Sequence, residues 1–103
     1  MMYIYNVTIH IEGHVESDWL LWIKSHIPEV LATNKFNKAT LSRVIGHEEG
    51  GVTYAIQYWA QSKDDLESYY KDYAPQLQKD GEAKFGSAMI GFRTELQVLE
   101  EFE

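Results

Sequence analysis

A histidine follows two tryptophans at helical spacing in the first third of the chain. Trp19, Trp22 and His26 are separated by three and four residues, so a helix places them on one face. An imidazole on such an apolar face can act as a general base or orient a bound ligand. The alternative, which we favour, is a core histidine bonded to a backbone carbonyl where Pro28 ends the helix. Burial would lower the pKa of His26, whereas the helix C-terminus would raise it.

Polar residues on three expected strands form a second candidate set. Its members are Asn6, Thr8, Gln57, Arg93 and Glu95. If the strand registers align, these side chains could line the barrel interior or a pocket mouth, where Arg93 recognises an acidic or carbonyl-bearing small molecule. The alternative, again favoured, is a structural polar network at a dimer interface. Arg93 and Glu95 would form an ion pair in it, because residues two apart on a strand point the same way.

The candidate site therefore has a catalytic part and a binding part. His26 and Arg93 are the predicted catalytic pair, with His26 as base and Arg93 as anion clamp. The predicted ligand-binding residues are Trp19, Trp22, Asn6, Thr8, Tyr54, Gln57 and Tyr58. A stripe of Tyr69, Tyr70 and Tyr73 could cover an aromatic substrate or a haem face, but core packing is the favoured interpretation.

The other histidines do not predict a metal centre. His10 and Glu12 share a strand face, but His14 lies beyond a glycine turn and no spacing fixes a fourth ligand. The run from His47 to Gly51 opens like a zinc-protease helix, yet glycine stands where the second histidine is required. We therefore predict no metal and no cofactor, since phosphate-binding glycine loops and nucleotide fingerprints are also absent from the sequence.

Composition and charge exclude several classes of protein. The chain has 103 residues, with 16 acidic and 9 basic side chains and a net charge of −7. Nucleic acids and anionic membranes attract basic surfaces, so neither is an expected partner. The sequence has no cysteine and no apolar leader, which favours a cytoplasmic protein. Seven tyrosines and three tryptophans are many for so small a core and favour assembly into an oligomer.

The expected elements alternate between strands and helices. Period-two alternation predicts strands at residues 2–11, 36–46, 52–61 and 87–99, with a hairpin loop at 47–51. Helical spacing predicts one helix from a Ser17 cap to about His26, where Pro28 kinks the chain and a short turn can follow at 29–31. A second helix should open at Ser62. The second helix should break just before Pro75, which starts a new segment that Gly86 ends.

This β-α-β-β-α-β order is typical of ferredoxin-like α+β folds. We expect one domain over residues 1–103, with a four-stranded antiparallel sheet and both helices on one face. The opposite face should be solvated, but its expected residues include the apolar set Met2, Ile4, Ala55, Trp59, Met89 and Leu99. A symmetric homodimer that packs two sheets face to face, a dimeric α/β barrel, would cover both of these faces.

Several short motifs, in order along nearly the whole chain, are similar to those of one bacterial family. They are Tyr5-Asn6-Val7-Thr8, Trp19-Leu20-x-Trp22, the run from His26 to Thr33, Thr53-Tyr54-x-x-Gln57-Tyr58, Ala74-Pro75-x-Leu77, and Lys84-Phe85-Gly86 followed by Phe92-Arg93-Thr94. The chain thereby resembles the small bacterial proteins of domain of unknown function 4286. Asn34 stands where that family often has glycine, and asparagine also tolerates left-handed dihedrals.

The resemblance implies the dimeric α/β barrel superfamily, and it implies no particular reaction. Members of that superfamily include antibiotic-biosynthesis-type monooxygenases, muconolactone-isomerase-like enzymes and haem-degrading enzymes. Two functions therefore stay open. We favour a non-enzymatic homodimeric module that binds a small molecule or a protein partner. The alternative is a cofactor-independent monooxygenase- or isomerase-like enzyme acting on an aromatic or lactone-like compound, and His26→Ala separates the two because only the enzyme would lose turnover.

Overall fold

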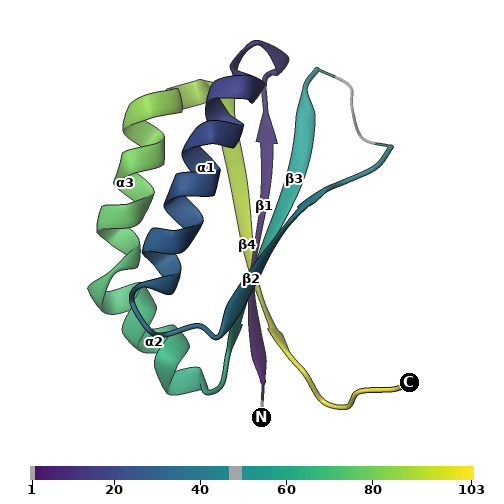
Figure 1. Cartoon of the computed structure of the whole chain (residues 1–103), viewed down its shortest axis with the longest axis vertical. Coiled ribbons are helices and arrows are strands. Elements are labelled where there is room, and N and C mark those ends of the chain that lie inside the picture. Colours follow the sequence, from purple (N-terminus) through teal and green to yellow (C-terminus); the bar gives the residue numbers. More distant parts are fainter. Residues whose placement is uncertain (1, 47–49) are drawn as a thin grey trace.

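Four strands pair into one antiparallel sheet within residues 2–46 and 50–103, which the computed structural model describes (Figure 1). The strands are β1 (Tyr3–Ile11), β2 (Lys38–Arg43), β3 (Val52–Ala60) and β4 (Met89–Gln97). Their order across the sheet is β2-β3-β1-β4, so β1 and β3 are central. The predicted hairpin loop at 47–51 joins β2 to β3, but its residues 47–49 lie outside the described part of the chain.

The helices all cover the same face of this sheet (Figure 1). They are α1 (Glu16–Leu31), α2 (Lys63–Asp72) and α3 (Ala74–Phe85). The Ser62 side chain accepts a hydrogen bond from the backbone N–H of Asp65 at 3.1 Å, which confirms the predicted cap. The break before Pro75 and the end at Gly86, whose φ is 54°, are also as predicted. The predicted ferredoxin-like α+β arrangement is thus confirmed.

Helix α1 differs from its prediction at both ends. It does not stop at His26 but continues through Pro28 to Leu31, because a proline removes one N–H donor and buried packing can hold the following turn. Val30 supplies that packing, being 1% exposed. At the other end Ser17 is not the cap, since a 3₁₀ turn at Gly13–Val15 leads into the helix. The longer helix places His26 inside the helix rather than at its end.

Two strands are shorter than predicted. The second strand was expected at 36–46 but β2 covers only Lys38–Arg43, and Phe36 is buried ahead of it. The last strand was expected at 87–99 but β4 covers Met89–Gln97, because residues 86–88 form a 3₁₀ turn. These shifts matter less than the phase of β4, which decides where its side chains point.

Pairing between β1 and β4 fixes that phase. Ile9 lies opposite Gly91, and Val7 lies opposite Arg93, so these four residues point toward the helices. Met89 belongs to the same set, since it lies opposite the fully buried Ile11. The expectation that Met89 lies on the face away from the helices is therefore wrong.

The face of the sheet away from the helices is here called the open face. Its residues are Ile4, Asn6, Thr8 and His10 of β1, Lys38, Thr40 and Ser42 of β2, Thr53, Ala55, Gln57 and Trp59 of β3, and Ile90, Phe92, Thr94 and Leu96 of β4. Three of its large apolar side chains are exposed, with Ile90 at 56%, Phe92 at 69% and Leu96 at 44%. Helices α1, α2 and α3 all lie on the other side of the sheet, so none of them covers this face (Figure 1).

The core between the sheet and the helices is unusually aromatic. Tyr5 of β1 is its centre: its ring centroid lies 5.8 Å from that of Tyr58, 5.7 Å from that of Tyr69 and 5.4 Å from that of Tyr70. Rings at such separations contribute more than their buried area alone. The tyrosine stripe of the second helix is therefore core packing for Tyr69, as favoured, while Tyr73 is 37% exposed.

Candidate functional site

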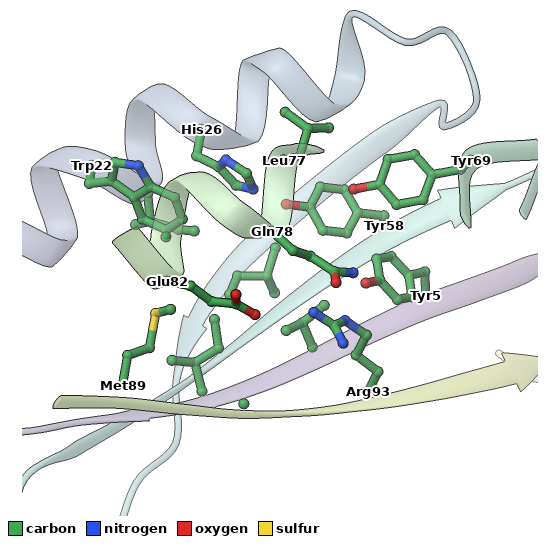
Figure 2. A pocket seen from close by; sticks show the side chains of 16 residues that line it. Tyr5, Trp22, His26, Tyr58, Tyr69, Leu77, Gln78, Glu82, Met89 and Arg93 are labelled. Carbon is green, nitrogen blue, oxygen red and sulfur yellow. The ribbon is translucent and has the colours of Figure 1, made fainter. Parts of the chain in front are cut away.

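A cavity of about 220 Å³ lies between α1, α3 and the sheet (Figure 2). One end is lined by the apolar side chains of Trp22 and Met89 (Figure 2). The other end is polar and carries Arg93 and Gln78 beside a group of phenols. A small volume with chemically different ends is characteristic of a site that orients one small molecule.

Packing at the apolar end depends on one glycine of α3. The ring of Trp22 stacks on His26 with centroids 4.5 Å apart and meets the edge of Phe85 at 5.6 Å. A Cβ atom at Gly81 would lie 2.8 Å from Cη2 of Trp22, closer than real Cβ contacts come. Gly81 therefore permits α3 to approach α1 at this point.

His26 has an unusual environment. Its Nδ1 atom is buried and has no hydrogen-bond partner in residues 2–46 or 50–103. The bond from this atom to a backbone carbonyl, which the favoured interpretation of His26 invoked, is therefore not formed. Burial lowers the pKa of the imidazole, and the opposing influence of Glu29 and Asp80 is smaller. His26 is thus a neutral imidazole at neutral pH, with its ring directed at the cavity (Figure 2).

The lowered pKa of His26 makes stability depend on pH. In the unfolded chain the imidazole has a pKa of 6.5, so between that value and the lower folded pKa the unfolded state binds more protons. The free energy of unfolding should therefore have its full value above pH 6.5 and decrease as the pH falls through the folded pKa of His26. Urea unfolding should show that the free energy of unfolding decreases less between pH 7.5 and pH 5.5 for His26→Leu than for the unchanged chain. His14→Gln, at an exposed turn residue, is the control, and an unaltered loss in His26→Leu would contradict the prediction.

The polar end is rich in hydrogen-bond donors. Arg93 and Gln78 hydrogen-bond to the Tyr5 hydroxyl, which partly offsets the rise in its pKa that burial causes. Burial also raises the pKa values of Tyr58 and Tyr69 well above the usual range. All three phenols therefore stay protonated and can donate hydrogen bonds to a ligand.

A second, more open cavity of about 370 Å³ adjoins the first at this end. Arg93 and Gln78 line both cavities, so they lie where the two meet. The predicted Arg93–Glu95 ion pair is not formed in the described chain, whose salt bridge joins Arg43 to Glu16. The Glu95 carboxylate instead accepts a hydrogen bond from Tyr70 and raises the pKa of that phenol, which burial already raises.

Four of the predicted site residues come together in the first cavity: Trp22, His26, Tyr58 and Arg93. Asn6, Thr8 and Gln57 do not join them, because the strand register places these three on the open face. There the Asn6 amide donates to the hydroxyls of Thr8 at 3.2 Å and Thr94 at 3.3 Å. The expectation that these residues share a lining with Arg93 is wrong, because Arg93 lies opposite Val7 and points toward the helices.

Trp19 and Tyr54 are core residues away from the cavity lining. Trp19 is fully buried and its ring centroid lies 4.9 Å from that of Tyr54. The Tyr54 hydroxyl donates to Glu16 Oε2 at 2.6 Å and accepts from Arg43 at 3.1 Å, while Arg43 also pairs with Glu16 at 2.9 Å. This group joins the start of α1 to β2 and β3, so its geometry is that of a structural tie.

Sequence reasoning missed the part of the site that α3 supplies. Gln78, Gly81 and Glu82 line the cavity, and none of them is among the predicted site residues. Their spacing of three and four residues puts all three on one helical face. A glycine inside a helix, flanked on that face by polar residues, was the available signal.

No group of three histidine, aspartate or glutamate side chains in the described residues could hold a metal ion. His10 faces Thr53, with 3.0 Å between Nδ1 and the hydroxyl. The run from His47 lies mainly outside the described residues. In the same part of the chain, none of the helices combines the length and apolar character that a membrane span requires.

The fold and the cavity between helices and sheet define a ferredoxin-like α+β protein. Within that class the chain belongs to the family described as Domain of unknown function (DUF4286), whose sequence profile matches residues 2–99. This confirms the resemblance stated from the motifs. No curated protein sequence matches the chain.

Solved structures support the fold assignment. A dimeric ferredoxin-like protein from an uncultured marine organism is 12% identical, with a TM-score of 0.66 and 98% of each chain covered. A protein from Bordetella bronchiseptica, proposed to be an antibiotic biosynthesis monooxygenase, is 14% identical, with a TM-score of 0.71 and 96% of this chain and 98% of that chain covered. An ethyl tert-butyl ether d (ethd) family protein from Bacillus halodurans is 13% identical, with a TM-score of 0.67 and 94% and 100% covered. At identities this low, the structural similarity shows a shared fold and nothing more.

Proposed function

We propose that this chain is a homodimeric module that binds a small, ring-containing molecule in the cavity between α1, α3 and the sheet. The observation that carries the proposal is the cavity itself, with an aromatic wall at one end and donors at the other. A volume of 220 Å³ is below that of sites for drug-sized ligands and suits a molecule of about ten non-hydrogen atoms. Trp22 offers a flat surface on which a ring can stack.

A homodimer would complete the protein by covering the open face. Exposed Ile90, Phe92 and Leu96 form an apolar surface, and a second copy of the chain has the same surface to offer. Similar structures from an uncultured marine organism and from Jannaschia are described as dimeric, which supports the same assembly here. Light scattering after size exclusion should give twice the chain mass of 12.0 kDa.

Filling the cavity from β4 tests the binding proposal. A Cβ atom at Gly91 would meet Cγ1 of Ile9 at 3.5 Å and the Thr8 carbonyl oxygen at 3.8 Å, both ordinary contacts. Gly91→Leu should therefore fold and project its side chain into the cavity, which Gly91 lines. We expect it to weaken binding of a single-ring ligand by at least about 10-fold, as measured by calorimetry. Gly91→Ala, which adds one methyl group, is the graded control; equal binding by all three proteins would place the ligand elsewhere.

A second candidate function is cofactor-independent oxygenase or isomerase chemistry on an aromatic or lactone-like compound. The neutral His26 at the cavity wall favours it, since a neutral imidazole can accept a proton from a bound substrate. Oxygen uptake or a change in ligand absorbance would reveal turnover. His26→Gln should abolish that turnover while leaving binding in place, whereas a pure binding module shows no turnover in either form.

The remaining parts of this proposal concern the setting of the protein. We place one domain over residues 1–103, in the cytoplasm, without nucleic-acid partners. The net charge of −7 supports the last point, because it opposes association with phosphate backbones.

A further inference from the structure

Arg93 has spare capacity for an anion. It makes no salt bridge in the residues that the structure describes, and its neighbour Glu95 is engaged by Tyr70. The Tyr5 hydroxyl takes up one of the five N–H groups that a guanidinium offers. A cavity-lining arginine with unused donors is a preorganised partner for a carboxylate, because its planar fork matches the two oxygens.

Other donors surround the same point. Figure 2 shows the Gln78 amide and the Arg93 guanidinium near the Tyr5 hydroxyl, from α3 and β4 respectively. The hydroxyls of Tyr58 and Tyr69 line the cavity as well, and neither forms a hydrogen bond within residues 2–46 and 50–103. Unused hydroxyl donors in the same cavity as a guanidinium fit a group that only accepts hydrogen bonds.

The far end of the cavity has the opposite character. Trp22 and Met89 offer carbon and sulfur surface there, and Figure 2 shows both away from Arg93. The imidazole of His26 is neutral and adds no cation to this end. A ligand that satisfies both ends therefore has an apolar ring and one anionic group.

Two carboxylates lie near the proposed anion. Glu82 lines the first cavity and Glu95 the second, and both are exposed residues. Water and salt screen these exposed charges, and Arg93, which is itself an exposed residue, is held where the cavities meet by its hydrogen bond to buried Tyr5. The repulsion from these glutamates weakens an anion's binding without removing the site.

We propose that the cavity selects a small monocarboxylic acid with a single ring, its carboxylate held by Arg93 and Gln78 and its ring placed against Trp22 and Met89. This inference rests on the proposed binding function and names its ligand class. Arg93 is then the residue that determines specificity, and the acid is preferred over any neutral analogue of the same shape.

A matched pair of probes tests the preference. Calorimetry at pH 7.5 would compare 3-phenylpropionate with 3-phenylpropanamide, which differ in charge but hardly in shape. The unchanged protein should bind the acid at least about 10-fold more tightly than the amide. Arg93→Gln should weaken acid binding by about 10- to 100-fold and change amide binding by less than about 3-fold. Arg93→Lys keeps the positive charge but loses the planar pair of N–H donors, so its affinity for the acid should lie between those of the unchanged protein and Arg93→Gln.

Glu95→Gln is the matched control, because it alters the same face of β4 two residues away. It should tighten acid binding, because it removes a carboxylate that repels the anion, and circular dichroism should show an intact fold for every variant. Equal binding of acid and amide would overturn this inference and leave the cavity's binding role standing. Binding of neither probe would overturn both proposals. An acid preference that Arg93→Gln leaves intact would overturn the role of Arg93.

Discussion

Phe92→Glu should convert the protein from a dimer into a monomer. Phe92 is 69% exposed on the open face and lies opposite Thr8, near the middle of β1. If a second sheet packs on this face, the variant places a carboxylate without a partner in a dehydrated interface on both copies. We expect the dissociation constant of the dimer to rise by at least about 100-fold. Light scattering at micromolar concentration should then give 12.0 kDa rather than twice that mass.

Leu21→Glu is the control for this experiment. Leu21 is 74% exposed, but it lies on α1 and not on the open face. The same change of charge there should leave the dimer intact. A dimeric Phe92→Glu protein would show that the copies associate through another surface, and a monomeric unchanged protein would rule out the dimer itself. Because Phe92 is exposed within one chain, neither outcome depends on loss of the fold.

The parts of the fold that depend on local chemistry were predictable. Ser62 caps α2 because a hydroxyl oxygen can accept from the N–H of Asp65, and that arrangement needs only the spacing of the two residues. The break before Pro75 and the glycine end at Gly86 follow from backbone restrictions of single residues. Alternation along β3 likewise identifies its buried face without further information.

The phase of β4 was not predictable in this way. The strand carries apolar residues on both faces, with Met89 on one and Ile90 and Phe92 on the other, so alternation does not say which face is buried. Pairing with β1 decides the question, because it aligns Gly91 with Ile9 and Arg93 with Val7. Long-range register of this kind separated Arg93 from the polar residues with which it had been grouped.

At Pro28, tertiary packing overrides a rule that depends on a single residue. A proline inside a helix normally ends it, but the buried Val30 keeps the last turn of α1 in place. The sequence therefore identified His26 as a wall residue but misplaced it at the end of the helix. The environment of its Nδ1 atom, buried without a partner in the described chain, depends on packing that no local pattern reveals.

Trp19→Ala should destabilise the fold far more than Trp22→Ala. The two tryptophans are three residues apart, which places them about 60° apart around a helix and hides their different environments from sequence reasoning. Trp19 is fully buried against Tyr54, so its removal leaves a large cavity in the core. We expect a loss of about 3–5 kcal/mol in the free energy of unfolding. In a domain of this size the melting temperature should fall by about 12 °C or more.

Trp22→Ala should have the opposite profile, because Trp22 forms the cavity wall and is only partly buried. It should lose less than half as much stability as Trp19→Ala but weaken binding of a ring-containing ligand by at least about 10-fold. Urea unfolding and calorimetry at one protein concentration measure both quantities, since dimer stability depends on concentration. Trp19→Phe adds a further test: the indole N–H of Trp19 is buried without a partner in the described residues, so its removal should carry no hydrogen-bond cost. Equal losses of binding in Trp19→Phe and Trp22→Ala would contradict the division between core and site.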